Sequence, residues 1–552
     1  MAALRVDDIL IARPRVPTSS HALLSVLAAH GVDRIFLVPG ESYLGILDGL
    51  NEYPHIDVVT CRHEAGAGFM ACADGRLTRR PGVVMVSRGP GASNAAIAIH
   101  TAQQDAIPLI VIVGQVPKSH LRKHAFQEID YQHMYGTIAK WVVEVSSPQA
   151  LGEAAFKAIR VATTGTPGPV VLVVPEDVQQ QDVDEFSWIS PGLAPTTAER
   201  ATRDEIRTQL RDARRPLLIA GGMMDQPGGR AALLAFAQAW NIPVAVAFRR
   251  HDLFPNRSPL YVGDLGLANP REQIEAFREC DLILALGTRL DDVTTQGYRF
   301  PNLPQPSQTL IHCYPDPAIV GAHFTPRIGL ACNPVTLARD LMPEEPFAPD
   351  DGRQAWNHRL RGIYEKLATW PIHNNDHALD FVGVVRAVQR YAPEDAIVSL
   401  DAGTFAAPVY RHFPFMPPQR LMAPLSGAMG YGVPAAVAAQ LRHPDRKVIC
   451  MVGDGGFMMT GNEMILAAKR ALPILFLLAN NHRYGSIRLH QDAQYPGRHL
   501  GTDLYNPDFQ HIASGFGLPS KRISSPEQID AAIQDAMRNQ GPQFLEFATH
   551  QP

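Results

Sequence analysis

The sequence predicts an α/β protein built from three doubly wound parallel-sheet domains. Its 552 residues exceed what one hydrophobic core can organise, since a domain usually takes roughly 150 residues. Short continuous Val/Ile/Leu runs also alternate with longer helical patterns, which is typical of parallel strands buried on both faces. These runs include "VVMVS", "PLIVIVG", "PVVLVVP", "RPLLIAGG", "IPVAVAF", "DLILALG", "KVICMV" and "PILFLLA".

Two Pro-rich stretches without a periodic pattern, residues 186–200 and 342–356, indicate domain boundaries. They divide the chain into an N-terminal domain (1–185), a central domain (195–345) and a C-terminal domain (355–552).

The first and third domains resemble each other internally. Gly66 precedes Gly89, and Gly430 precedes Gly453, by the same 23 positions. We therefore expect one α/β design to occur twice in the chain.

Composition excludes several function classes. Hydrophobic residues make up 46% and charged residues 19%, while the net charge of −4 gives no electrostatic reason to bind nucleic acid or an anionic membrane. No apolar run approaches the ~18 residues that span a bilayer. The N-terminal stretch "MAALRVDDILIARPR" lacks the apolar core of a signal peptide, and the six cysteines form no CxxC pattern. We expect a protein of the reducing cytoplasm with buried, unpaired cysteines.

Two polar side chains mark the ends of successive predicted strands. Asp454 follows the strand "KVICMV" in the turn "GDGG", a helix is expected over residues 462–472, and Asn481 follows the strand "PILFLLA". Because carboxyl ends of parallel strands share one edge of a sheet, the two side chains should lie close together. A carboxylate and an amide oxygen beside glycines suit a hard cation that bridges to a diphosphate. The alternative for GDG alone is a tight turn with a capping aspartate.

The same stretch resembles a known motif. GDG and NN with 24 residues between Gly455 and Asn480 are similar to the thiamine-diphosphate binding motif. Nearly the whole chain resembles the acetolactate-synthase (acetohydroxyacid-synthase) large-subunit family. Further stretches that carry the resemblance are "FLVPGESYLGILDGLN", "CRHEAGAGFMACADGRLTRRPGVVMVSRGPGASN", "VGQVP" followed by "AFQE", "LALGTRLDDVTT" and "SGAMGYGVPAAVAAQ".

The resemblance implies thiamine diphosphate and Mg²⁺ as cofactors. It makes Asp454, Asn481 and the backbone carbonyl of Arg483 the magnesium ligands. Met429 would bend the cofactor, although its alternative is a core methionine, and the carbonyl of Gly427 would accept from the aminopyrimidine. The residues expected along the diphosphate are Gly403, Thr404, Gly453, Gly455, Gly456, Phe457 and Gly485.

Glu64, in "RHEAGAGF", supplies the other half of the implied chemistry. By resemblance its carboxylate contacts the pyrimidine ring and promotes the tautomer that removes the thiazolium proton. A desolvated glutamate followed by Ala and Gly could hold the raised pKa that this role needs. The alternative is a glutamate that stabilises a helix start. In the family the two halves of one site come from different subunits, which implies a homodimer or a homotetramer.

Residues near the reacting carbon define the expected substrate pocket. Phe126 and Gln127 of "AFQE" correspond to residues that the synthases place near the substrate, and Gln115 lies nearby or anchors a loop. Ser486 and His490 stand where the synthases carry a Met and a Trp. The pocket should therefore be roomier and more polar than in those enzymes.

Glu41, in "VPGESYL", stands where some thiamine-dependent decarboxylases carry an acid that handles protons. We expect it either to protonate the reaction intermediate or to cap the following helix.

The central domain contains "LIAGGMMDQPGG" and "GTRLDDVTT", which resemble the flavin-binding domain of the synthases. The stretch "YVGDLGLANP" lacks their GMHG-like turn, so FAD is compatible with the sequence without being required. The alternative is a purely structural domain.

Together these features predict an enzyme that decarboxylates a 2-oxo acid such as pyruvate and joins the remainder to a second carbonyl compound. The alternatives within the same superfamily are a 2-oxo acid decarboxylase and a 2-hydroxyacyl lyase. A nicotinamide dehydrogenase would need GxGxxG after a strand, which neither glycine cluster provides cleanly. A non-catalytic regulatory subunit would not need Glu64, Asp454 and Asn481 together.

Overall fold

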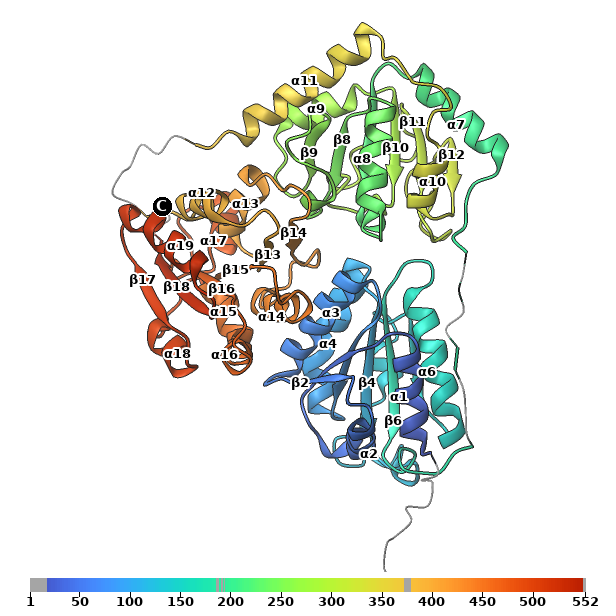
Figure 1. The fold of residues 1–552 in the computed structure, drawn as a ribbon, viewed down its shortest axis with the longest axis vertical. Coiled ribbons are helices and arrows are strands. Elements are labelled where there is room, and N and C mark those ends of the chain that lie inside the picture. The colour runs from blue at the N-terminus through green and yellow to red at the C-terminus, as the bar shows by residue number, and fades with distance from the viewer. Residues whose placement is uncertain (1–16, 185–187, 190–191, 193, 372–378, 550–552) are drawn as a thin grey trace, which may run out of the picture.

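The fold comes from a computed structural model that describes residues 17–184, 188–189, 192, 194–371 and 379–549. Figure 1 shows three lobes, each built around a six-stranded sheet whose named pairings are all parallel. The predicted fold class is confirmed. The N-terminal stretch examined for a signal peptide, and part of the predicted linker 186–200, lie outside the described residues. Within the described residues, no helix has the length and apolarity to cross a membrane.

The N-terminal sheet has the strand order β2-β1-β3-β4-β6-β5. Its strands are β1 (Arg34–Leu37), β2 (Asp57–Thr60), β3 (Gly82–Val86), β4 (Leu109–Gln115), β5 (Trp141–Glu144) and β6 (Pro169–Pro175). The helices are α1 (Ser19–Ala29), α2 (Leu44–Gly49), α3 (Glu64–Thr78), α4 (Pro90–Asp105), α5 (Tyr131–Tyr135) and α6 (Pro148–Thr163). Every residue of β4 and β6 is buried, as expected for strands covered on both faces.

The central sheet has the order β12-β11-β10-β7-β8-β9. Its strands are β7 (Pro216–Ala220), β8 (Val244–Ala247), β9 (Tyr261–Leu265), β10 (Leu282–Leu286), β11 (Thr309–Cys313) and β12 (Ile328–Leu330). The helices are α7 (Arg200–Asp212), α8 (Gly229–Ala239), α9 (Arg271–Arg278), α10 (Pro334–Asp340) and α11 (Asp351–Ala368). This order is that of dinucleotide-binding sheets, with a topological switch point between β7 and β10.

The C-terminal sheet, β14-β13-β15-β16-β18-β17, repeats the strand order of the N-terminal sheet. Its strands are β13 (Ile397–Leu400), β14 (Arg420–Met422), β15 (Val448–Gly453), β16 (Leu475–Asn480), β17 (Ser520–Ile523) and β18 (Gln543–Ala548). The helices are α12 (Phe381–Tyr391), α13 (Ala407–His412), α14 (Gly432–Arg442), α15 (Asp454–Thr460), α16 (Ile465–Lys469), α17 (Gly485–Gln494), α18 (Phe509–Gly515) and α19 (Ile529–Arg538). The expected duplication is therefore visible in the topology.

The helical region after the GDGG stretch differs from the prediction. α15 starts directly at Asp454, so this residue begins a helix and does not sit in a free turn. The helix expected over 462–472 is divided into a 3-10 turn, Gly461–Met464, and the short α16. Glycines at 455, 456 and 461 let side chains pack directly on this backbone, since a Cβ there would lie 2.5 Å from Tyr484, 2.9 Å from Asp401 and 2.8 Å from Phe457.

α11 corrects the predicted start of the C-terminal domain at residue 355. This helix packs on the central domain, where Trp356 and Leu360 join an apolar core with Phe277. The buried Arg353 donates to backbone carbonyls of Leu210 and Ala213, also in the central domain. The Pro-rich stretch 342–356 thus contains the connection from α10 and the first turns of α11, because this helix folds back onto the central domain.

The N- and C-terminal domains share one apolar core. α3 and α14 are rich in Ala and Gly, so they approach closely, and Figure 1 shows α14 against α3 and α4. Phe69 of α3 contacts the ring of Tyr431 with 5.7 Å between centroids. Arg76 of α3 is 1% exposed and donates to the carbonyls of Leu421 and Ala423 in the C-terminal domain. The two domains therefore form a single packed unit.

Gly82 at the start of β3 provides a test of this packing. A Cβ at this position would lie 1.9 Å from the carbonyl oxygen of Ala71 in α3. We expect Gly82→Ala to lower the free energy of unfolding by about 3 kcal/mol, because backbone would have to move against backbone. The control is Gly362→Ala in α11, where a Cβ meets nothing within 4 Å and helix propensity alone should stabilise by about 1 kcal/mol. Calorimetric melting of both variants decides; equal melting temperatures would refute the close approach.

Candidate active site

A cavity of about 210 Å³ opens at the carboxyl ends of β13, β15 and β16 in the C-terminal domain. This is the topological switch point of that sheet, where open α/β sheets bind ligands. It gathers most of the residues predicted for the cofactor and its metal, namely Gly403, Thr404, Gly427, Met429, Gly453, Asp454, Gly455, Gly456, Asn481, Arg483 and Gly485, together with Ser486 of the predicted substrate pocket. Segments far apart in the sequence therefore meet at one site.

Two residues predicted from the C-terminal domain do not line this cavity. The side chain of Phe457 packs into the core between the rings of Phe509 and Phe544. Its backbone N–H belongs to the first turn of α15, which leaves a backbone contact with a phosphate as the remaining prediction. His490 is exposed on α17.

Asp454 is held rigidly in the cavity wall and is only 3% exposed. Its Oδ1 accepts from the N–H of Gly455 at 2.9 Å, and Oδ2 accepts from the N–H of His482 and from Nδ2 of Asn506, both at 2.8 Å. A carboxylate offers about four acceptor positions, so the side chain is oriented and still has capacity for a cation.

The two asparagines after β16 have different roles. Asn480 is buried, donates to Glu546 at 2.8 Å and accepts from Asn506 at 2.9 Å. Asn481 lines the cavity, and its Oδ1 accepts from the N–H of Arg483 at 3.2 Å. Asn506 therefore links Asp454 to the end of β16. No sequence signal marks it, because it stands 52 positions after Asp454 in an irregular segment.

Asp401, which the sequence prediction missed, fixes the loop that carries Met429. Its buried carboxylate accepts from the N–H groups of Gly430, at 2.9 and 3.0 Å, and of Gly432, at 3.3 Å. Burial raises the pKa of Asp401 to about 6, although these hydrogen bonds oppose the shift. Gly427 and Gly430 have φ of 69° and 87°, a region that favours glycine.

A second group of predicted residues lies at the switch point of the N-terminal sheet. Glu64 is the first residue of α3, and its Oε2 accepts from Asn94 of α4 at 2.9 Å. Gly91 lies so close that a Cβ there would be 3.2 Å from Oε1 of Glu64. Glu41 is exposed at the start of a 3-10 turn after β1. Asn94 was not predicted and orients Glu64 from the neighbouring helix.

The remaining pocket residues lie in or beneath one loop of the N-terminal domain. Gln127 has φ of 64° and approaches Gly89, where a Cβ would lie 2.7 Å from its carbonyl oxygen. Phe126 is 78% exposed. Gln115 is 1% exposed and donates to the carbonyl of Ile129 at 3.2 Å, so its side chain serves the loop-anchor alternative.

Glu463 connects the C-terminal domain, which holds the cavity residues, to the segment of the N-terminal domain that carries Glu64. It stands in the 3-10 turn after α15, and its Oε1 accepts from the N–H groups of Arg62 and His63, both at 2.9 Å. Burial raises the pKa of Glu463 to about 7, and the nearby Glu64 acts in the same direction. The C-terminal domain therefore holds the backbone that precedes Glu64, although no residue of the N-terminal domain lines the C-terminal cavity.

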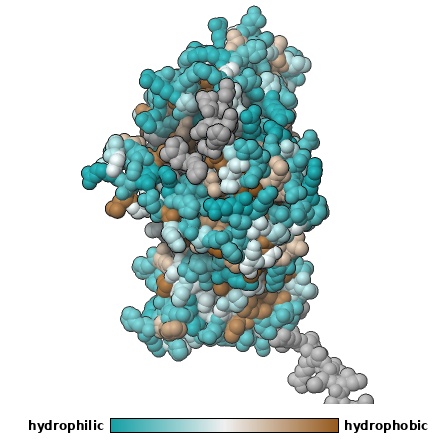
Figure 2. All heavy atoms as spheres, turned by 90° about the vertical axis from the view of Figure 1, so that its left-hand side faces the viewer, coloured by the Kyte–Doolittle hydropathy of each residue, from teal (hydrophilic) through white to brown (hydrophobic). Residues whose placement is uncertain are grey.

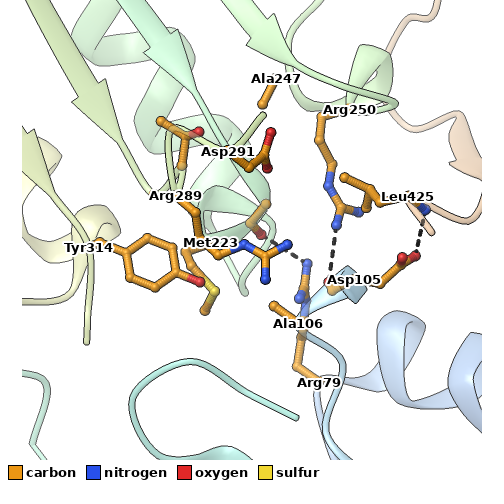
Figure 3. Close-up of a pocket in the computed structure, with 13 residues that line it drawn as sticks. Arg79, Asp105, Ala106, Met223, Ala247, Arg250, Arg289, Asp291, Tyr314 and Leu425 are labelled. Atoms are coloured by element: carbon orange, nitrogen blue, oxygen red, sulfur yellow. Dashed lines mark hydrogen bonds between the residues drawn. The ribbon is translucent and has the colours of Figure 1, made fainter. Parts of the chain in front are cut away.

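The central domain has its own crevice at the switch point between β7 and β10, shown in Figure 3. Arg79 donates to the carbonyl of Gly222 at 3.3 Å, Arg250 to that of Asp105 at 3.4 Å, and Arg289 to that of Gln104. The crevice encloses about 30 Å³, room for a few water molecules at most. Burial and neighbouring arginines lower the pKa of Arg250 to about 9. Its Nη1 and Nε of Arg79 are buried without a partner among the described residues.

Comparison with known proteins gives a consistent result along the chain. Models of the thiamine pyrophosphate enzymes match residues 17–134 (N-terminal TPP binding domain), 204–341 (central domain) and 401–547 (C-terminal TPP binding domain). The acetolactate synthase isozyme 1 large subunit of Escherichia coli K12 is 31% identical over 96% of this chain and 93% of its own. The acetolactate synthase large subunit of Corynebacterium glutamicum is 31% identical over 97% of this chain and 87% of its own. The probable acetolactate synthase large subunit of Methanocaldococcus jannaschii is 29% identical over 96% and 91%.

Glu463 makes stability depend on pH in a defined direction. Its pKa in the folded protein, about 7, exceeds the ordinary value of 4.5, so stability is highest below pH 4.5 and falls as pH rises through 7. We expect Glu463→Gln, which stays neutral, to remove on the order of 3 kcal/mol of this pH dependence. The control is Glu394→Gln at an exposed position. Melting temperatures from pH 4.5 to 8 test this; parallel curves for wild type and Glu463→Gln would contradict it.

Proposed function

The chain belongs to the thiamine pyrophosphate enzyme family, and from this premise we propose that it is a thiamine-diphosphate-dependent carboligase of 2-oxo acids. The observation that carries the proposal is the single cavity at which Asp454, Asn481 and a series of glycines meet. The named activity of the acetolactate synthase relatives supports the same reaction class, in which a 2-oxo acid such as pyruvate loses CO₂ before its remainder is joined to a second carbonyl compound.

The cavity residues fit thiamine diphosphate with Mg²⁺. Asp454, Asn481 and the carbonyl of Arg483 supply oxygen ligands, and Mg²⁺ prefers to complete its shell with phosphate oxygens and water. No described group of three His, Cys, Asp or Glu side chains could hold a metal by itself, which is consistent with an ion shared with a diphosphate. When bound, thiamine diphosphate supplies the nucleophilic carbon that attacks the 2-oxo acid and accepts the electrons left by CO₂.

The chain's own residues orient the cofactor and the substrate, and they transfer protons at the reaction centre. Asn94 holds the Glu64 carboxylate, which we assign to the cofactor's pyrimidine ring, and the loop anchored by Asp401 presents Met429 and Gly427. Glu41 is positioned at the switch point of the N-terminal sheet to handle a proton. Gln127 and Phe126 approach the substrate from the adjacent loop.

Ser486 and His490 shape the acceptor side of the proposed pocket. They stand four positions apart on α17, hence on one face of the helix. Because they are smaller and more polar than the Met and Trp of the synthases, the pocket is roomier and favours a polar acceptor. The superfamily alternatives, a 2-oxo acid decarboxylase and a 2-hydroxyacyl lyase, therefore stay open at this point.

We propose that the working enzyme is a homodimer or a homotetramer. Glu64 does not line the cavity that contains Asp454, which supports an arrangement in which a second copy brings the N-terminal half of each site. Exposed apolar side chains follow the same elements: Met458 and Met459 on α15, Ile487 and Leu489 on α17, and Ile97 on α4. Figure 2 also shows an apolar patch over the lower half of the molecule, where Figure 1 places the N-terminal domain.

The size and charge of the central crevice indicate whether it has room for FAD. Its buried, unpartnered guanidinium donors suit a phosphate group, but an enclosed space of about 30 Å³ does not fit a flavin ring while Arg250 and Arg289 cross it. The flavin is thus not assigned a role in the reaction, and the visible absorbance of the purified protein is the direct check on its presence.

Cellular location and domain limits are also proposals. All six cysteines are unpaired and buried, which supports a reducing cytoplasm. We retain domain limits of 1–185 and 195–345 for the first two domains, and we extend the central domain through α11.

The function is tested with pyruvate. Purified protein with thiamine diphosphate and Mg²⁺ should release CO₂ and form acetolactate. Glu41→Gln should lower turnover by roughly 10²–10⁴ and shift the ratio of acetaldehyde to ligated product, because proton delivery is removed. Acetaldehyde alone from the wild type would favour the decarboxylase alternative. A loaded enzyme inert toward all 2-oxo acids would refute the proposed function, and unchanged kinetics in the variant would reduce Glu41 to a helix cap.

Measurements of cofactor binding distinguish the roles of the two half-sites. Asp454→Ala should abolish magnesium-dependent binding of thiamine diphosphate, because Asp454 is the only proposed protein ligand with a formal charge. Glu64→Gln should bind the cofactor yet turn over orders of magnitude more slowly. Calorimetry and steady-state kinetics measure both effects; wild-type affinity in Asp454→Ala would remove the metal assignment.

A further inference from the structure

A cavity of about 590 Å³ lies where all three domains meet. Leu77 and Arg79 line it from the N-terminal domain, Asp225 and Arg230 from the central domain, and Arg420 from the C-terminal domain. It shares no lining residue with the candidate active site and only Arg79 with the central crevice. None of the chemistry described above uses this cavity.

Its walls carry paired charges. Asp225 accepts from Arg79 at 2.8 Å and from Arg420 at 2.8 Å. Behind it, Asp252 accepts from Arg230 at 2.7 Å and from Arg420 at 3.3 Å. Burial acts to raise the pKa of both carboxyls, but the surrounding arginines outweigh it and hold both pKa values low. Both aspartates are therefore charged.

A fourth arginine leaves the positive charge in excess. Arg446 lines the cavity and donates to the carbonyls of Asp395 at 2.7 Å and Pro418 at 2.9 Å. These are neutral acceptors, and Arg446 forms no ion pair with a described carboxylate. Burial lowers its pKa, the Asp395 carboxylate opposes this, and repulsion from Arg420 and Arg230 lowers it further. Four arginines thus line the cavity and Asp225 is the one described carboxylate that lines it, so positive charge is in excess at the cavity wall.

The shape of the cavity narrows the class of ligand. Its volume falls in the range of pockets for small organic molecules, roughly 300–1,000 Å³, and exceeds what a single inorganic ion needs. Leu77 and Leu234 add apolar surface, while Pro227, Pro255 and Pro417 make the walls stiff. Guanidinium groups bind phosphates and carboxylates in a forked geometry.

We propose that this three-domain junction binds a small organic dianion, a phosphate monoester or a dicarboxylate, whose negative charge complements the excess of arginines at the cavity wall. Because its walls come from all three domains, the ligand stabilises their mutual arrangement, and with it the spacing of the half-sites on the outer domains. The junction is therefore a regulatory site separate from the catalytic cavity.

The test uses the full chain saturated with thiamine diphosphate and Mg²⁺, so that the diphosphate pocket is filled. Adenosine monophosphate and succinate are the phosphate and dicarboxylate probes; acetate and chloride at equal ionic strength are controls. At about a hundred times its dissociation constant a bound dianion should raise the melting temperature of this 552-residue chain by about 2 °C. The absence of a shift and of calorimetric binding with both dianions would overturn the proposal.

Single substitutions test whether the dianion that raises the melting temperature binds in this cavity. Arg446→Gln should lose the shift and lower dianion affinity at least tenfold, while Arg446→Lys should restore part of it. Ala231→Phe, which fills the cavity without removing a charge, should also abolish binding. Arg214→Gln, an exposed arginine outside the cavity, and Arg289→Gln in the central crevice should respond like wild type. An undiminished response in both Arg446→Gln and Ala231→Phe, or loss in Arg289→Gln alone, would overturn the assignment.

Discussion

The apolar core shared by the N- and C-terminal domains is the constraint on which the candidate active site depends. The two helices at its centre also start at functional segments: Glu64 begins α3, and the loop with Met429 leads into α14. Small residues let these helices pack closely, while Arg442 at the far end of α14 donates to Asp33 and Asp74 at 2.8–2.9 Å. Any shift of one helix against the other would therefore move a half-site.

Sequence reasoning predicted the features that depend on local pattern. Buried strands appear as continuous apolar runs, and the carboxyl ends of β15 and β16 are adjacent because these strands pair directly, with Gly453 opposite Ala479. That pairing turns the spacing of Asp454 and Asn481 into proximity. The fold class and the proximity of Asp454 and Asn481 could be predicted for this reason, whereas the other residues of the C-terminal cavity were expected only from the family resemblance.

Residues that act through long-range contacts could not be predicted in this way. Asn506 reaches Asp454, Asn94 reaches Glu64, and Glu463 reaches a loop 400 positions earlier in the chain. Each is a polar residue in an unremarkable local context, and only the folded chain gives it a partner. The domain limit near 355 failed for a related reason, since the prolines before α11 suggested a linker while the apolar face of α11, with Trp356, returned the chain to the central sheet.

Two buried acids show how this geometry is maintained. Asp401 and Glu463 each clamp backbone N–H groups of a loop that leads to a site residue, and burial raises the pKa of both carboxyls, to about 6 and about 7. A buried carboxylate costs stability unless hydrogen bonds offset its desolvation. An apolar side chain of similar size would avoid that cost, but it could not accept from two backbone N–H groups. The two acids therefore stabilise loop conformation at the expense of global stability. Asp401 holds a loop of the C-terminal domain and Glu463 holds a loop of the N-terminal domain, so the two loops lie on opposite sides of the contact between these domains.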